Sequence, residues 1–272
     1  GNQTIEMLNL SPAERIRMLT VNMERLRWLP REMPSYYLIV NIAGFDMEAI
    51  LDGELVRKYK VIVGKDYRKT PVFSSTMQYL VFNPTWTIPP TILKEDVIPA
   101  VRKDITYLSS KNISIYDSKG NRMNPDSLIW KGSRIQHYTF RQEPGQGNAL
   151  GLVKFMFPNK FSVYLHDTPS KELFNRTERA FSSGCIRVQD PFELAAFLLR
   201  DQPAYSIEGI KKIIQTKTPT TVRLKAKPEV YLIYLTAWVD EDNQINYRKD
   251  IYQRDQAVYS ALQEKPKFDL PK

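Results

Sequence analysis

The sequence predicts an α+β fold that is mostly β. Short segments of alternating apolar and polar residues, bounded by turn residues, recur through most of the chain. One boundary is Asp52-Gly53, a dipeptide typical of two-residue β-hairpins. Helical periodicity is confined to a few segments. With 272 residues, 42% of them apolar, the chain can build one large domain or a domain with sizeable insertions.

The first predicted element is a helix. The Ser-Pro-Ala-Glu string at 11–14 is a capping box with proline at the first helical position. Apolar residues then recur at helical spacing, at Ile16, Leu19, Met23 and Leu26. We therefore expect a helix from residue 12 to about 28, ended by Pro30.

A β-rich stretch follows, with strands expected at 36–42, 46–51 and 54–63. Prolines interrupt the strand pattern around Trp86. Residues 94–133 carry helical and short extended patterns with a turn at 118–121, and 134–141 reads as a strand. The composition of 143–148 predicts a mobile loop.

The second half returns to strands. We expect two core strands at 150–157 and 161–165, with His166 at the exit of the second. Helices are expected from Asp190 to about Arg200 and from Ser206. The last predicted elements are strands at 221–224 and 229–239 and a helix over 251–262. The pattern suggests an antiparallel sheet.

Composition excludes several classes of function. No apolar run is long enough to span a membrane, and one cysteine excludes an internal disulfide framework. No zinc-type spacing and no glycine-rich phosphate loop are present. The net charge of +9 is spread along the chain, which suits an anionic polymer such as a bacterial cell wall, a nucleic acid, or an ordinary solvated surface. The chain begins at Gly1, so the lack of an export signal excludes nothing.

The most specific feature is the only cysteine, Cys185, in the string Ser-Ser-Gly-Cys-Ile-Arg. A lone cysteine is most often a small buried hydrophobe. Here, however, Gly184 permits a sharp turn, Arg187 supplies a cation that should lower the thiol pKa, and His166 lies nineteen positions upstream. Together they have the parts of a nucleophilic cysteine enzyme. The only other histidine, His137, is more typical of a structural polar residue.

These motifs resemble the L,D-transpeptidase family, which carries the YkuD domain. The shared pattern is a histidine, a linker of similar length, then Ser/Thr-His-Gly-Cys, a variable residue and Asn or Arg. Ser183 stands where many members have a second histidine, and Arg187 occupies the Asn/Arg position, which is similar to the YcbB-type branch. The resemblance extends over residues 13–260, with further matching stretches at 83–90, 147–151, 154–159 and 164–169.

The resemblance implies a reaction that needs no metal or organic cofactor. Cys185 would attack a tetrapeptide stem of peptidoglycan, D-alanine would leave, and the thioester would pass to the side-chain amine of a second stem, giving a 3-3 cross-link. His166 would be the base, oriented by the backbone carbonyl or the side chain of Asp167. The oxyanion donors would be the backbone N–H of Cys185 and of Gly184 or Ser183.

Substrate-binding roles are open to structural alternatives. Arg187 would bind a substrate carboxylate, or else form a structural ion pair. Tyr164 and Trp86 would line the pocket, or else pack in the core. Ser182 completes the set of expected binding residues.

The resemblance also implies a YkuD-like β-sandwich or barrel with an inserted capping subdomain. We expect an N-terminal helical flank at 1–30, the first catalytic part at 31–94, and the insertion at 95–148. The catalytic part with the Cys/His motif follows at 149–224, and a strand and helix extension at 225–272. The implied location is the periplasm or cell envelope.

Three other readings remain open. A cysteine L,D-carboxypeptidase or amidase would form the same acyl-enzyme and pass it to water. An inactive peptidoglycan-binding protein would not need Cys185 and His166. A nucleic-acid-binding module has only the charge in its favour. Carbapenem-type β-lactams are implied as covalent inhibitors, and the oligomeric state is not predicted.

Overall fold

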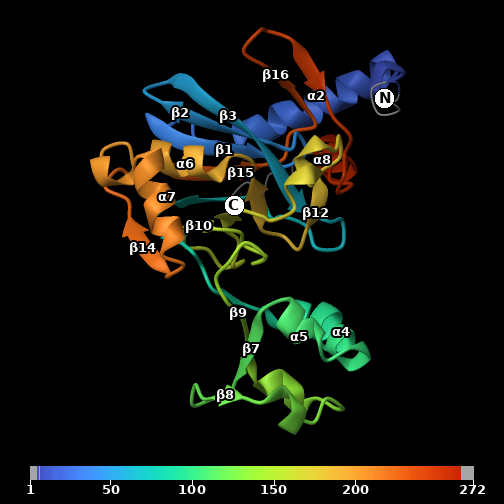
Figure 1. Cartoon of the computed structure of the whole chain (residues 1–272). Coiled ribbons are helices and arrows are strands. Elements are labelled where there is room, and N and C mark those ends of the chain that lie inside the picture. Colours follow the sequence, from blue (N-terminus) through green and yellow to red (C-terminus); the bar gives the residue numbers. More distant parts are fainter. Residues whose placement is uncertain (1–4, 6, 265–272) are drawn as a thin grey trace, which may run out of the picture.

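The computed structural model describes residue 5 and residues 7–264. Figure 1 shows a large body from which a smaller unit, coloured green, projects. The body contains a mixed sheet of eleven strands that curves into a half-barrel with helices against it. The predicted mostly β fold with helices is therefore confirmed. Residues 1–4, 6 and 265–272 of the predicted terminal flanks lie outside the described residues.

The body sheet runs in the order β14-β5-β10-β11-β13-β3-β2-β1-β15-β4, and β12 pairs with β3. Its strands are β1 (Tyr36–Asn41), β2 (Asp46–Leu51), β3 (Glu54–Gly64), β4 (Phe73–Thr76), β5 (Tyr79–Phe82), β10 (Val153–Met156), β11 (Leu165–His166), β12 (Ala180–Ser182), β13 (Ile186–Val188), β14 (Thr220–Arg223) and β15 (Glu229–Ile233). The expected antiparallel sheet is wrong in part, because β11 pairs with β13, and β1 with β15, in parallel.

The other body elements are α2 (Pro12–Arg27), α6 (Pro191–Leu198), α7 (Ile207–Gln215), α8 (Asp255–Gln263), the 3-10 turns Lys171–Asn175 and Pro203–Tyr205, and a hairpin of β16 (Ala237–Val239) with β17 (Ile245–Tyr247). The predicted capping box starts α2, with the Glu14 N–H donating to Ser11 Oγ at 3.3 Å and the Ser11 N–H to Glu14 Oε2 at 2.8 Å. Arg25 of α2 forms a buried ion pair with Asp255 of α8 at 2.6 Å, which ties the two flanks together.

The projecting unit has its own sheet and its own core. Its elements are β6 (Trp86–Thr87), α3 (Pro90–Ile92), a π-helical turn η1 (Leu93–Val97), α4 (Ile98–Lys103), α5 (Tyr107–Ser110), β7 (Ile113–Tyr116), β8 (Arg122–Met123), the 3-10 turns Pro125–Ser127 and Arg134–His137, and β9 (Thr139–Gln142). The strands form a four-stranded sheet in the order β6-β9-β7-β8 around a hydrophobic cluster that includes Ile115 and Phe140. We call residues 86–142 the insertion, and propose these bounds for the unit expected at 95–148.

Several predicted strands are shorter than expected, among them the one at 150–157, which is reduced to β10, and three others have a local reason. The strand at 134–141 begins as a 3-10 turn, which buries Ile135 in the insertion core while its polar neighbours stay exposed. The strand at 161–165 is reduced to β11, because the side chain of Asn159 hydrogen-bonds the backbone of Phe161 and Val163. The strand at 229–239 breaks after Ile233, where side chains cap the next backbone N–H groups.

The loop at 143–148, expected to be mobile, is tied to both parts of the chain. Asn148 is buried, and its side-chain amide donates to the carbonyls of Pro84 at 3.1 Å and Glu143 at 3.0 Å. The amide of Gln142 donates to the carbonyls of Lys111 and Gly147. These two amides fasten the insertion to the start of the second catalytic stretch.

Candidate active site

The two residues of the predicted pair lie on neighbouring parallel strands. Leu165 of β11 pairs with Ile186 of β13, and His166 pairs with Arg187. Leu165 and Ile186 are fully buried in the body core. Because side chains alternate along a strand, Tyr164 and His166 from one chain segment and Cys185 and Arg187 from the other share the opposite face. The fold therefore gathers four of the expected site residues.

A braced turn presents Cys185 immediately before β13. Gly184 has φ +113°, a conformation that L side chains rarely adopt, so glycine is required here. Ser182 Oγ donates to the Cys185 carbonyl at 2.5 Å and accepts from the Gly184 N–H at 3.1 Å. The Ser182 hydroxyl is thus buried and used inside the turn, so the expected substrate-binding role for it is not supported.

The same bond narrows the candidate oxyanion donors. Since the Gly184 N–H already donates to Ser182, the N–H groups of Ser183 and Cys185 remain for a developing oxyanion. Of the two alternatives left open by the sequence, this hydrogen bond favours Ser183.

A buried network that sequence reasoning missed supports the turn from behind. Thr70 Oγ1 donates to the Gly184 carbonyl at 2.9 Å and accepts from the Gly64 N–H at 2.9 Å. The hydroxyl of Tyr252, near the C-terminal helix, donates to the Gly64 carbonyl at 2.5 Å. No local motif signals the contacts of Thr70 with Gly184 and of Tyr252 with Gly64, because each joins segments more than a hundred residues apart in the chain.

His166 is held by a backbone acceptor. Its Nδ1 lies 2.5 Å from the carbonyl oxygen of Asp167. A carbonyl only accepts, so Nδ1 carries the proton and Nε2 is left as the basic nitrogen. Burial lowers the pKa of His166 to about 3, and the positive charges of Arg187, Lys171 and Lys154 add to the shift. The imidazole is therefore neutral at neutral pH, as a general base must be.

The Asp167 side chain does not orient the imidazole. Its Oδ2 accepts from the Leu152 N–H at 2.8 Å, and its Oδ1 accepts from the Thr168 N–H at 2.7 Å and pairs with Lys171. A Cβ at Gly151 would overlap Asp167 Oδ2, so this carboxylate packs directly on a glycine backbone. The backbone carbonyl of Asp167 therefore contacts the imidazole, and its side chain holds the surrounding loops.

The pKa of the Cys185 thiol is shifted in the direction opposite to the one expected from the sequence. Burial raises its pKa, whereas hydrogen bonds from the backbone and side chain of Tyr164 and the charge of Arg187 act in the opposite direction. The expected cation-lowered thiol pKa is wrong, because desolvation outweighs the cation. The thiol lies 3.7 Å from the Ser162 carbonyl, to which it donates. Thiol and imidazole are thus both neutral in the resting state.

Arg187 has free hydrogen-bonding capacity on the site face. Its Nε is buried without a partner, and the ion pairs among the described residues do not include it. No ion pair within 4.0 Å therefore involves Arg187 there, although the charge of Glu172 acts on its guanidinium. A guanidinium in this state is suited to bind a carboxylate.

Tyr164 connects the thiol to the insertion. It is a hydrogen-bonding partner of Cys185, and the Trp86 side chain also hydrogen-bonds it. Trp86 packs at the same time against the insertion core. Burial raises the pKa of Tyr164, so its hydroxyl remains protonated and able to donate.

Sequence reasoning also missed Lys154. This residue of β10 pairs with His166 in the sheet and shares its face. Its Nζ lies 6.0 Å from the centroid of the Tyr164 ring, and burial lowers its pKa. Because side chains alternate along β10, Lys154 and the core residue Phe155 point to opposite faces of the sheet. Only the pairing register of β10 with β11 places Lys154 beside His166.

His137, the other histidine, is exposed in the insertion.

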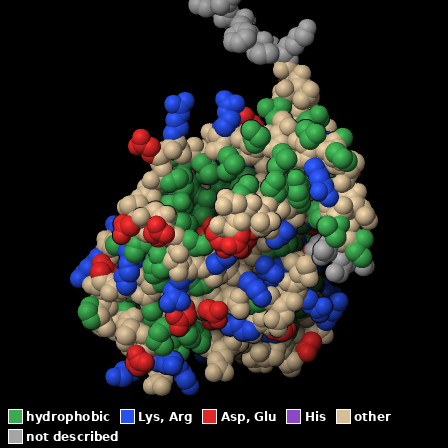
Figure 2. Space-filling view, turned by 90° about the horizontal axis from the view of Figure 1, so that it is seen from above, with side chains coloured by type: hydrophobic (Ala, Val, Ile, Leu, Met, Phe, Trp, Pro, Cys, Tyr) green, Lys and Arg blue, Asp and Glu red, His purple; other side chains and the backbone are tan. Residues whose placement is uncertain are grey.

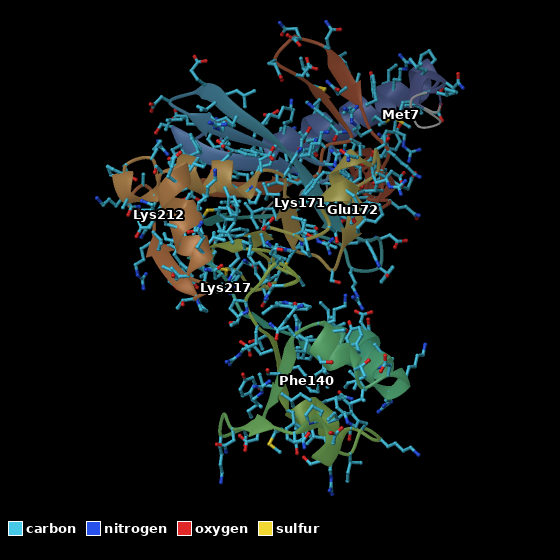
Figure 3. The ribbon with its side chains drawn as sticks, in the orientation of Figure 1. Met7, Phe140, Lys171, Glu172, Lys212 and Lys217 are labelled. Carbon is cyan, nitrogen blue, oxygen red and sulfur yellow. The ribbon has the colours of Figure 1, made fainter. Side chains whose placement is uncertain are left out.

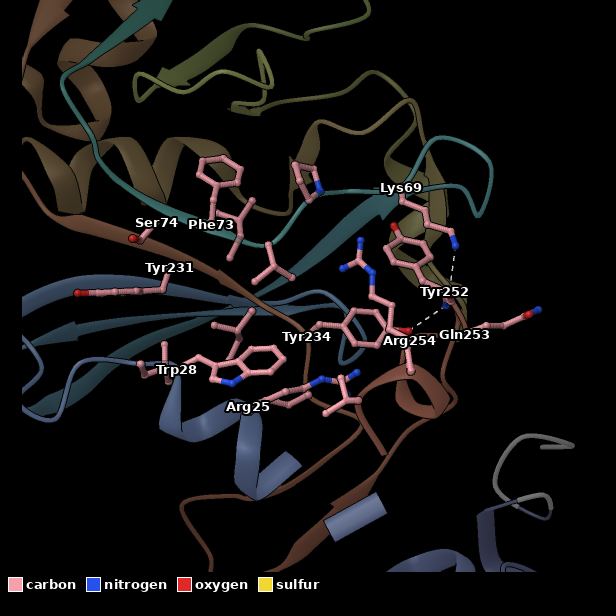
Figure 4. Close-up of a pocket in the computed structure, with 18 of the residues that line it drawn as sticks. Arg25, Trp28, Lys69, Phe73, Ser74, Tyr231, Tyr234, Tyr252, Gln253 and Arg254 are labelled. Carbon is pink, nitrogen blue, oxygen red and sulfur yellow. Dashed lines mark hydrogen bonds between the residues drawn. The ribbon is translucent and has the colours of Figure 1, made fainter. Parts of the chain in front are cut away.

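A separate cavity lies away from these residues. A cavity of about 980 Å³ is lined by the C-terminal end of α2, the strands β4 and β15 and the segment before α8 (Figure 4). Aromatic rings and cations line it, among them Trp28, Tyr234, Lys69 and Arg254. Neither Cys185 nor His166 contributes to it.

Other classes of site find no support in the described part of the chain. No group of three or more His, Cys, Asp or Glu side chains there could hold a metal ion. None of the helices described has both the length and the hydrophobicity of a membrane span. Figure 2 shows Lys and Arg side chains interspersed with Asp and Glu over the face seen from above, with hydrophobic side chains gathered around a hollow.

Comparison with known proteins agrees with this geometry. The model of the L,D-transpeptidase catalytic domain, YkuD, matches residues 35–223. A Haemophilus influenzae protein named "Putative L,D-transpeptidase" is 36% identical over 244 residues, covering 89% of this chain and 49% of that protein. The chain thus spans about half the length of this curated relative.

Two solved structures are more distant. An L,D-transpeptidase from Mycobacterium smegmatis is 14% identical with a TM-score of 0.33, covering 73% of this chain and 58% of its own. The catalytic domain of an E. faecium L,D-transpeptidase acylated by ertapenem is 11% identical with a TM-score of 0.30, covering 74% of this chain and 99% of its own. Scores this low add nothing to the assignment. On the match of the family model over residues 35–223, the chain belongs to the YkuD family of L,D-transpeptidase catalytic domains.

Proposed function

We propose that the chain is a cysteine L,D-transpeptidase that forms 3-3 cross-links between peptidoglycan stems. The observation that carries this proposal is the shared face of β11 and β13. A neutral imidazole, a thiol and an unpaired guanidinium lie there at adjacent register positions. Acyl transfer from one amide to another needs a nucleophile, a base and an anchor for the substrate, and this face supplies all three.

The donor stem binds through its carboxylate. Arg187 takes that carboxylate with its free N–H groups, and Lys154 adds positive charge on the same face. Binding would bring the carbonyl of the third stem residue to Cys185, while Tyr164 and Trp86 form one wall of the cleft. Desolvation of these cations makes an anionic substrate group a favourable partner.

Acylation then proceeds by proton transfer between neutral groups. His166 Nε2 removes the thiol proton as Sγ attacks the carbonyl carbon, and the N–H groups of Ser183 and Cys185 stabilise the oxyanion. The imidazolium returns that proton to the amine of the leaving D-alanine, which leaves a thioester on Cys185. The Asp167 carbonyl keeps hold of Nδ1–H throughout.

Deacylation follows the steps of acylation in reverse order, with a second amine in place of D-alanine. The side-chain amine of a second stem attacks the thioester, His166 takes its proton, and the thiol is regenerated by return of that proton to sulfur. Water in place of the amine would make the chain a carboxypeptidase or amidase. The same acyl-enzyme makes carbapenem-type β-lactams expected covalent inhibitors, because their strained carbonyl acylates a nucleophile without a fast leaving step.

We also propose that the insertion caps the donor cleft and keeps water from the thioester. Trp86 belongs to the insertion core and hydrogen-bonds the Tyr164 side chain, which itself contacts Cys185. Assignment to the YcbB-type branch and a location in the periplasm or cell envelope complete the proposal.

The test is incubation with purified muropeptides followed by mass spectrometry. We expect loss of D-alanine, an acyl adduct on the peptide containing Cys185, and stem dimers joined between third residues. Free tripeptide without dimers would instead identify a hydrolase. Retention of unmodified stems with no adduct would identify a binding protein and overturn the proposal.

A further inference from the structure

Arg68 joins the insertion to the turn that presents Cys185. It lies in the loop between β3 and β4, and its side chain is only 14% exposed. Its Nη2 contacts Glu95 Oε2 at 2.6 Å, and its Nη1 contacts Asp96 Oδ2 at 2.8 Å. Both carboxylates belong to η1 of the insertion. One side chain of the body therefore carries two ion pairs to the insertion.

The same guanidinium reaches the catalytic turn. Arg68 Nη1 also donates to Ser183 Oγ at 2.8 Å, two residues before Cys185. The Arg68 carbonyl faces the turn as well, 3.8 Å from where a Cβ at Gly184 would lie. A shift of the carboxylates would therefore act on the nitrogen that holds Ser183.

The local backbone sets the two acidic residues side by side. In η1 the Ile98 N–H bonds the Leu93 carbonyl five residues back, so the helix is locally wider than an α-helix. Such π-helical turns are often found at functional sites. Here the carboxylates of the consecutive residues Glu95 and Asp96 both form ion pairs with the guanidinium of Arg68.

A second route connects the same two parts. Trp86 packs against the insertion core and hydrogen-bonds Tyr164, a hydrogen-bonding partner of Cys185. Arg68 belongs to the β3–β4 loop and Trp86 to β6, so two separate segments connect the insertion to the residues around the thiol. The polar contacts are directional, which a purely apolar contact would not be.

We propose that Arg68 is a positioning residue that couples closure of the insertion to the geometry of the Ser183–Cys185 turn. Its ion pairs with Glu95 and Asp96 hold the insertion over the thiol, and its bond to Ser183 holds the turn in place. The inference rests on the proposed function for its consequence, which is that the closed state favours the amine acceptor over water.

Access to the thiol can be measured without any substrate, because Cys185 is the only cysteine in the chain. The test compares the rate of Cys185 alkylation by iodoacetamide in the wild type, Arg68→Gln, the double variant Glu95→Gln/Asp96→Asn, and Arg68→Lys. Lys94→Gln is the matched control, since it removes one exposed charge from the same turn η1. Melting temperature is recorded for each.

Arg68→Gln and the double variant should both alkylate at least about fivefold faster, the lower end of usual coupling between sites. Arg68→Lys should have an intermediate alkylation rate, because the lysine ammonium keeps the positive charge but not the planar set of N–H donors of the guanidinium. Lys94→Gln should match the wild type. The double variant alters only half-exposed side chains, so it remains informative if Arg68→Gln fails to fold. Addition of salt should move the wild type toward the variants.

A double variant that alkylates at the wild-type rate would overturn the inference, even if Arg68→Gln alkylates faster. Arg68 would then act on the thiol only through its hydrogen bond to Ser183, and not through its ion pairs with the insertion. Failure of the proposed function has another signature, the absence of a thioester with muropeptides in the wild type. Where the thioester forms, the ratio of hydrolysed to cross-linked product should rise with the alkylation rate across the series. An unchanged ratio in variants with faster alkylation would overturn the coupling to acceptor choice.

Discussion

The body and the insertion are stabilised in different ways, although one chain forms both. The body buries a continuous core against its curved sheet, and the candidate site lies on the other face of β11 and β13. The insertion packs around a separate, smaller cluster that includes Phe140, which Figure 3 labels well away from Lys171 and Glu172 of the body. The candidate site residues thus lie on the unit with the larger core, where side-chain positions are most strongly determined.

The contacts between the two parts include several polar ones. The amides of Gln142 and Asn148 fasten the base of the insertion, and Arg68 binds its turn η1. Half-exposed ion pairs of this kind contribute little to stability, about 0–1 kcal/mol each. They do fix orientation, so the junction is suited to movement between defined positions.

Loss of the nucleophile should have the largest effect. Cys185→Ala should abolish thioester formation and reduce turnover by about 10⁴-fold or more, while the fold survives because the change removes one atom. His166→Ala should lose activity by a comparable factor, since residues that act as a unit are not additive. Turnover on muropeptides and circular dichroism check both. Product at the wild-type level from Cys185→Ala would remove the thiol from the mechanism.

A matched pair of core substitutions tests whether the two units are independent. Phe155→Ala in the body and Phe140→Ala in the insertion each delete a nearly fully buried ring, at a cost of about 3–5 kcal/mol. We expect Phe155→Ala to lower the main melting transition and to abolish acylation. Phe140→Ala should leave that transition in place and allow acylation by a small β-lactam. Equal shifts of a single transition would show that the insertion does not fold as a separate unit.

The Arg187 side chain separates catalysis from stability. Arg187→Lys should reduce kcat/KM for the donor by about 10- to 100-fold, because a charge-assisted fork is replaced by a point charge. The melting temperature should change little, because no ion pair of Arg187 is lost among the described residues. Comparison of kinetics with thermal unfolding tests this. Small and equal effects on both would favour a structural role.

Much of this arrangement could be predicted from local patterns. The capping box at Ser11, the hairpin at Asp52-Gly53 and the helix from Pro191 each depend on neighbouring residues, and the structure contains all three. Cys185 and His166 were proposed because a thiol, a glycine and a cation stand close together in the chain, with a histidine nineteen positions upstream. The identity of the residues carries that information without any knowledge of the fold.

The features of the site that could not be predicted depend on contacts between segments that are far apart in the sequence. Lys154 reaches the site only through the register of β10 with β11, and Thr70 supports Gly184 across 114 positions. The direction of the thiol pKa shift was also inaccessible, because it depends on how deeply Cys185 is buried. The short strand β11 follows from a side chain, Asn159, which takes over backbone hydrogen bonds.

The buried imidazole of His166 gives the body a pH-dependent contribution to stability. His166 has a pKa near 3 when folded and about 6.5 when unfolded, so below pH 6.5 the unfolded chain binds more protons at this residue. The contribution of His166 to stability should therefore fall as pH decreases from 6.5 toward 3, by on the order of 1–3 kcal/mol at pH 4, whereas Asp46, whose pKa burial raises to about 6, contributes in the opposite direction. Urea unfolding at pH 7 and pH 4 measures this. His166→Gln should lose less stability between the two pH values, and an equal loss would contradict the assignment.

The smallest effect is expected at the loop that joins the two units. Residues 144–146 can be shortened while Gln142, Glu143 and Asn148 are kept, so that the amide anchors and the bond from Tyr116 to Glu143 at 2.9 Å can still form. A strained connection should tilt the insertion and admit water to the thioester. We expect the ratio of hydrolysed to cross-linked product to rise by up to roughly fivefold, or about 1 kcal/mol in relative barriers. Mass spectrometry of the products measures that ratio, with acylation by a small β-lactam as the control for an intact thiol. An unchanged ratio in a folded variant would mean that this loop does not set the position of the cap, and if Glu95→Gln/Asp96→Asn also left the ratio unchanged, the capping role itself should be abandoned.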